Sequence, residues 1–75
     1  MFVQIEKLPD NIETWGDKAD RSQVEVIYLN INNVVYLSKR DYSTKVILAN
    51  GLYIYVDDKN ALKIVEAVIS AKGGA

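Results

Sequence analysis

Apolar and polar residues alternate along most of the first three quarters of the chain, with the two-residue period of strands that bury one face. This pattern predicts five strands, at about residues 2–8, 24–30, 34–39, 44–49 and 52–57. Pro9 ends the first strand, because proline has no N–H for a strand ladder. Residues 9–22 do not alternate and predict a long loop with room for a helical turn. Trp15, the one large apolar residue of this loop, is expected to anchor it on the core, with a binding hot spot as the alternative.

The spacing becomes helical after the last strand and predicts a helix over about residues 59–72. Asp57 or Asp58 can cap its N-terminus, and Gly73 can end it. Its expected buried stripe consists of Leu62, Val65, Val68 and Ile69, with Ala61 and Ile64 alongside. We therefore expect one small α+β domain over residues 1–75. It is an antiparallel β-meander, open or curled into a small barrel, with the helix on its aliphatic face.

The dipeptide Asn50-Gly51 allows two registers for the last hairpin. A two-residue turn pairs Val46 with Tyr55 and mixes aliphatic and aromatic side chains on both faces. A turn centred on Ala49 and Asn50, with Gly51 as a left-handed bulge, instead pairs Val46 with Ile54. We favour the second register, because it keeps core and solvent positions on separate faces.

In that register the face opposite the aliphatic residues is amphipathic, and three interpretations of it remain open. Strand tyrosines are commonly half-exposed with the hydroxyl in water. The face could also pack against the N-terminal strands or against a second copy of the chain. Finally, its rings could stack on nucleic-acid bases while Lys39, Arg40 and Lys45 contact phosphates. The expected interaction surface consists of Tyr36, Lys45, Ile47, Tyr53 and Tyr55.

Residues suited to catalysis or metal binding are scarce. The chain has no cysteine and no histidine, which removes disulfides, thiolate ligands and the commonest catalytic base. It has neither a glycine-rich phosphate loop nor a recognisable serine nucleophile motif. The adjacent acids Asp57 and Asp58 are more typical of a helix cap than of a metal site. We therefore expect a protein that is not an enzyme and holds no cofactor or metal.

Charge and hydropathy narrow the function classes further. The net charge is −1, with −3 in the first 25 residues and +2 in the rest, well short of a strong electrostatic footprint for nucleic acid. No apolar run approaches about 18 residues, and no basic segment precedes an apolar one, so we expect neither a membrane span nor a signal peptide. These features predict a cytoplasmic location.

Two turn motifs resemble a known family. Asn30–Leu37 and Thr44–Gly51 resemble the N-x-D-x-I-x-x-I and T-x-I-x-L-x-N-G patterns of the small flagellar and swarming-motility protein family, and Tyr55–Val56 resembles the aliphatic strand end that follows them. That resemblance implies a small regulatory or assembly protein rather than a catalyst. The same strands are also similar to the C-terminal strands of LytTR-type DNA-binding domains, which implies phosphate contacts at the cations named above.

These observations together predict a small, non-catalytic interaction or regulatory module. We expect it to self-associate through the Tyr53/Tyr55 face or through an exposed strand edge, and to contact an unidentified protein. A nucleic-acid-binding module that uses the Tyr/Lys sheet face is the alternative.

Overall fold

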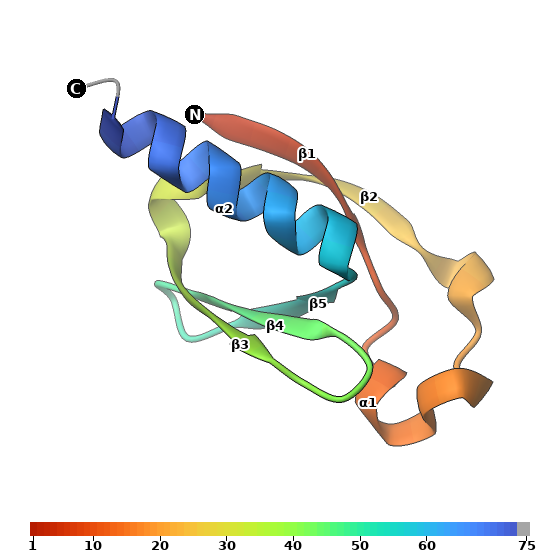
Figure 1. The fold of residues 1–75 in the computed structure, drawn as a ribbon. Coiled ribbons are helices and arrows are strands. Elements are labelled where there is room, and N and C mark those ends of the chain that lie inside the picture. Colours follow the sequence, from red (N-terminus) through yellow and green to blue (C-terminus); the bar gives the residue numbers. More distant parts are fainter. Residues whose placement is uncertain (74–75) are drawn as a thin grey trace.

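Five antiparallel strands and one long C-terminal helix form an α+β fold in the computed structural model, which describes residues 1–73 (Figure 1). Short helical turns occupy the segment predicted as a long loop and the connection between the second and third strands. The elements are β1 (Phe2–Lys7), α1 (Ile12–Trp15), η1 (Gly16–Lys18), η2 (Arg21–Gln23), β2 (Glu25–Asn30), η3 (Ile31–Asn33), β3 (Val34–Lys39), β4 (Thr44–Leu48), β5 (Tyr53–Val56) and α2 (Asp58–Gly73).

The strands form two separate sheets, β1-β2 and β3-β4-β5, rather than one meander, and they do not close into a barrel. The break lies at η3, where the side chain of Asn30 accepts a hydrogen bond of 3.1 Å from the Asn32 N–H and starts a 3₁₀ turn. Asparagine side chains favour such local bonds over continuation of a strand ladder. One backbone bond, from the Leu8 N–H to the Tyr55 carbonyl oxygen at 2.8 Å, links the end of β1 to β5.

The core lies between the two sheets and is covered by α2, which runs across them in Figure 1. Each sheet contributes β-branched or leucine side chains from its inner face, as the two-residue period requires. The buried members of this cluster are Ile5, Leu29, Ile31, Val46, Ile54, Val56 and Ile64.

The helix is rotated relative to the predicted stripe. Ile64 is fully buried and Val68 packs against the core, whereas Leu62, Val65 and Ile69 are exposed. The prediction that these last three residues line the core is therefore wrong. Small residues on the buried side explain the rotation, since Ala61, Ala67 and Ala71 let the helix lie close to the sheets.

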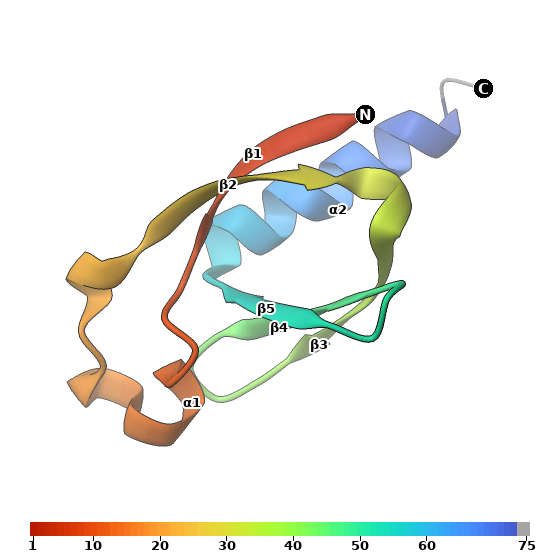
Figure 2. The ribbon, with the colours of Figure 1, turned by 180° about the vertical axis from the view of Figure 1, so that it is seen from behind.

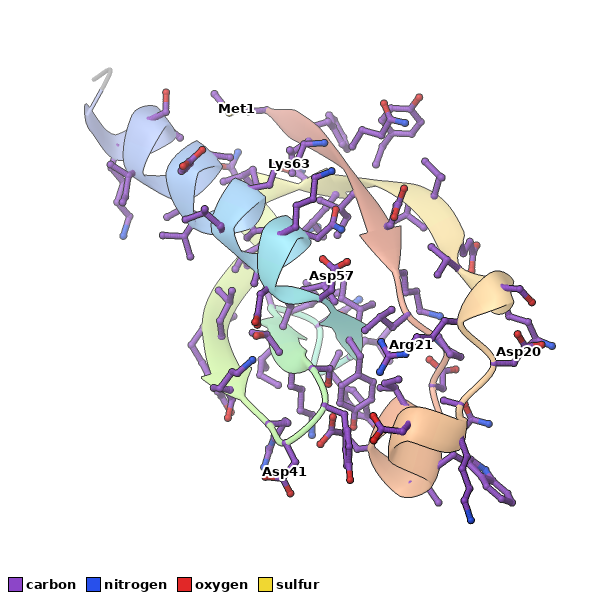
Figure 3. All side chains as sticks on the ribbon, turned by 45° about the vertical axis from the view of Figure 1, so that its right-hand side comes forward. Met1, Asp20, Arg21, Asp41, Asp57 and Lys63 are labelled. Carbon is purple, nitrogen blue, oxygen red and sulfur yellow. The ribbon has the colours of Figure 1, made fainter. Side chains whose placement is uncertain are left out.

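The start of α2 is fixed by Asp57, which Figure 3 shows at this end of the helix. Its carboxylate accepts hydrogen bonds of 2.8 Å from both the backbone N–H and the side-chain amide of Asn60, which confirms Asp57 as the cap. The Asn60 side-chain oxygen in turn accepts the Glu6 N–H at 3.0 Å. The cap therefore also ties α2 to β1. Among the described residues no helix is long and apolar enough to span a membrane.

A second, smaller cluster lies under the short helical turns. Ile12 is fully buried there with Leu8 and Ala19. Trp15 is instead 57% exposed, so the prediction that it anchors this segment is wrong. The smaller, branched Ile12 takes that role, and the tryptophan ring lies on the surface.

Candidate interaction surface

The hairpin between β4 and β5 adopts the favoured register. Val46 pairs with Ile54 and Ile47 with Tyr53. Gly51 has φ +86°, and its N–H donates to the Leu48 carbonyl oxygen at 3.0 Å. This left-handed residue is the bulge that lets the strands realign, so the prediction of a segregated hairpin is confirmed.

A second bulge, on β3, brings Tyr36 to the same face. The pairing of β3 with β4 shifts between Val34 and Tyr36, which leaves Val35 as the additional residue. After the shift Tyr36 lies opposite Ile47, and Ser38 lies opposite Lys45. We call the resulting outer surface of β3-β4-β5 the aromatic face. It consists of Tyr36, Lys45, Ile47, Tyr53 and Tyr55.

Contacts within the aromatic face hold the rings of Tyr53 and Tyr55 in place. The Tyr53 and Tyr55 rings meet edge to face, with centroids 5.5 Å apart and an interplanar angle of 75°. Lys45 Nζ lies 4.0 Å from the centroid of the Tyr53 ring, a cation–π geometry. Tyr36 is 55% exposed and Tyr53 is 50% exposed. The surface is thus ordered and open to contact.

Tyr55 differs from the other two tyrosines because it also packs against the smaller cluster. Desolvation raises the pKa of its hydroxyl above the usual value near 10, and the neighbouring Tyr53 adds to this shift. The hydroxyl therefore stays protonated at neutral pH and remains a hydrogen-bond donor.

The three predicted phosphate-contacting cations gather at one polar cleft of about 430 Å³ beside Tyr55. Lys39, Arg40 and Lys45 line it, but so do Glu13 and Asp41. Lys39 Nζ also forms an ion pair of 2.5 Å with Asp58. Acidic groups therefore offset much of the positive charge at this place.

Glu13 organises the wall of the cleft. Its carboxylate accepts hydrogen bonds from the Asp41 N–H at 3.1 Å, the Tyr42 N–H at 3.0 Å and the Ser43 hydroxyl at 2.7 Å. Figure 3 shows Asp41 at the tip of the loop that joins β3 to β4. One side chain of α1 thus fixes the loop that carries Arg40, an arrangement that sequence reasoning missed because the two segments lie far apart in the chain.

An apolar groove of about 330 Å³ between α2 and β3 was also missed. Val35, Val65 and Ile69 are exposed along it, and Tyr36 connects it to the aromatic face. The helical spacing of Val65 and Ile69 is visible in the sequence, but by itself it predicts core positions.

No family model, curated protein or solved structure matches this chain. The resemblance to the flagellar and swarming-motility family therefore stays a prediction, and the functional argument depends on the surfaces described above.

Proposed function

We propose that this chain is a small, non-catalytic, cytoplasmic interaction module that works by protein–protein contact, including contact between copies of itself through the aromatic face. The observation that carries the proposal is the row formed by Tyr36, Ile47 and Tyr53 across three paired strands. The other side of the same sheet is buried in the core.

Three properties of the row favour protein contact. Tyrosine is enriched at interfaces because its ring offers apolar area while its hydroxyl tolerates water. The edge-to-face pair and the lysine above it restrict the side chains before binding, which lowers the entropy cost of contact. The groove beside Tyr36 continues the apolar surface beyond the sheet.

The test is the molar mass in solution, measured by light scattering behind a sizing column over a range of concentrations. Tyr53→Lys should lower the mass of the native oligomer while the variant stays folded, because it places a second cation beside Lys45 on the aromatic face. Leu62→Lys is the matched control, since Leu62 is similarly exposed but lies on α2. A central aromatic anchor is worth about 2 kcal/mol or more, so we expect a weakening of at least about 30-fold. An unchanged mass in Tyr53→Lys would refute self-contact through this face.

The second candidate function is binding of single-stranded nucleic acid on the same face. It is favoured by the convergence of Lys39, Arg40 and Lys45 beside the edge-to-face tyrosine pair, whose exposed ring surface bases could stack on. Such binding should weaken steeply as salt is added and should be lost in Lys45→Glu. Protein contact is preferred because Glu13, Asp41 and Asp58 lie among these cations.

A further inference from the structure

The two sheets have four outer edges, formed by β1, β2, β3 and β5. The β1 and β5 edges face each other where β1 ends. The free edge of β1 meets α2 and β5: the Glu6 N–H donates to Asn60 Oδ1 at 3.0 Å, and the Leu8 N–H donates to the Tyr55 carbonyl oxygen at 2.8 Å. The same contact covers the end of the β5 edge. These two bonds occupy the outward N–H groups of Glu6 and Leu8 and the carbonyl of Tyr55.

The edge of β3 carries features that oppose pairing with another strand. The bulge at Val35 interrupts the regular ladder, and Lys39 ends the strand with a charge. Bulges and edge lysines are common means by which sheets avoid pairing with other chains.

The edge of β2 lacks these features. Its register with β1 runs without a shift from Glu25 to Asn30, and the segment contains no lysine, arginine or proline. Among the described residues β1 is its only strand partner, and Figure 2 shows its outer edge with no other element beside it. Val26 and Tyr28 on it are 52% and 70% exposed. A regular edge that exposes apolar side chains in this way is a template for strand addition.

The direction of its free backbone groups follows from the ladder. The Ile31 N–H donates to the Met1 carbonyl oxygen at 3.0 Å, so Ile31 and Met1 form a hydrogen-bonded pair. Such pairs alternate with non-bonded ones in an antiparallel ladder. Leu29 and Ile27 therefore bond to β1, and the N–H and carbonyl groups of Val26 and Tyr28 point outward. The Asn30 N–H points outward as well, whereas its carbonyl accepts the first bond of η3, whose N-cap is Asn30.

We propose that β2 pairs antiparallel with β2 of a second copy, about a two-fold axis at Tyr28, to form a continuous four-stranded sheet. In this register Tyr28 lies opposite Tyr28 of the second copy and Val26 lies opposite Asn30, so every outward residue meets an outward residue. Glu25, the only charged residue of the strand, lies opposite Ile31, and no like charges meet. An antiparallel edge is self-complementary under a two-fold axis, which makes a second copy the occupant that fits it. This contact lies on the sheet opposite the aromatic face and goes beyond the proposed function.

The chain offers a register-specific test, because it contains no cysteine. In Tyr28→Cys the two introduced thiols would face each other across the axis, with Cα atoms about 5.5 Å apart, within the range that a disulfide bridges. In the matched variant Val26→Cys the thiols would lie about 14 Å apart, four residues along the strand, and should not join. We expect a covalent dimer of Tyr28→Cys under mild oxidation and none of Val26→Cys. Equal cross-linking of both variants, or of neither, would overturn the proposal.

Light scattering separates this contact from the aromatic face. The strand pair buries less than the roughly 800 Å² per partner of a standard interface, so concentrations up to about 1 mM are needed. Tyr28→Lys should reduce the mass, because it places two cations opposite each other at the axis, and Leu62→Lys should not. If Tyr28→Lys leaves the mass unchanged while Tyr53→Lys lowers it, the β2 contact is refuted and the aromatic face is supported. If only Tyr28→Lys lowers the mass, the reverse holds.

Discussion

Replacement of Glu13 by alanine should destabilise the fold far more than an ordinary surface substitution. Glu13 is one of six acidic residues in the first 25 positions, and nothing in the sequence distinguishes it. In the structure it accepts three hydrogen bonds from the loop between β3 and β4, at 2.7–3.1 Å. Ser43, one of the donors, is buried at 1% exposure. Alanine would leave that hydroxyl without a partner.

The magnitude follows from the burial of each donor. A buried hydroxyl left unsatisfied costs about 1–3 kcal/mol, and the two exposed backbone bonds add about 0.5 kcal/mol each. We therefore expect Glu13→Ala to lower the free energy of unfolding by about 2–4 kcal/mol. A core in a domain of this size supplies roughly 3–5 kcal/mol, so the variant should fold with little stability to spare.

Urea denaturation followed by circular dichroism measures this effect. With a slope of about 1 kcal/mol per molar urea, the midpoint should fall by about 2–4 M. Glu66→Ala, an exposed acid on α2, is the control and should change the free energy by less than about 0.5 kcal/mol. The double variant Glu13→Ala/Ser43→Ala should recover part of the loss, because it removes the unsatisfied hydroxyl. A Glu13→Ala variant within about 0.5 kcal/mol of the native chain would refute this account.

Three further outcomes are expected. Ile64→Ala should cost about 2–5 kcal/mol in urea denaturation, whereas Leu62→Ala should cost less than about 0.5 kcal/mol, because the first side chain is fully buried and the second lies in water. Gly51→Ala should cost about 1–2 kcal/mol from backbone strain alone, since φ is +86° and nothing lies within 4 Å of the added carbon. The raised pKa of Tyr55 means that the unfolded chain loses this proton first, so the contribution of Tyr55 to stability should be constant below pH 10 and fall as the pH rises through the folded-state pKa. Alkaline unfolding of Tyr55→Phe should show less of this fall; an identical pH profile would contradict the assignment.

Local chemistry explains which parts of the fold could be predicted. The β4-β5 register followed from the sequence because Gly51 tolerates a positive φ and only one register separates Val46 and Ile54 from Tyr53 and Tyr55. The antiparallel strands and the C-terminal helix followed from the two-residue and helical periods of the apolar residues. These are properties of neighbouring residues, and no distant contact is needed to decide them.

The errors have a common cause in tertiary packing. The rotation of α2 depends on how closely Ala61, Ala67 and Ala71 approach the sheets, and alanine adds little to a hydrophobic pattern. No residue type in the sequence marks the bulge at Val35. This bulge nevertheless places Tyr36 on the aromatic face. Likewise, the two sheets separate at η3 because the Asn30 side chain forms a local hydrogen bond with the Asn32 N–H, which competes with continuation of the strand ladder.

The two proposed contacts together make a stronger claim than either does alone. The β3-β4-β5 sheet shares the core with the β1-β2 sheet, and the aromatic face is its outer surface, which points away from that core. The aromatic face and the β2 edge therefore lie on different sides of the molecule (Figures 1 and 2). Two different two-fold contacts on one molecule join it to two neighbours and generate an open row, or a closed assembly such as a D2 tetramer where the axes intersect, rather than a dimer. The molar mass of the native chain should therefore rise beyond that of a dimer as the concentration increases. Tyr28→Lys and Tyr53→Lys should each stop this growth at a dimer, and the double variant should be a monomer. A native mass that levels off at a dimer would show that only one of the two contacts exists, and the single variant that dissolves this dimer would identify it.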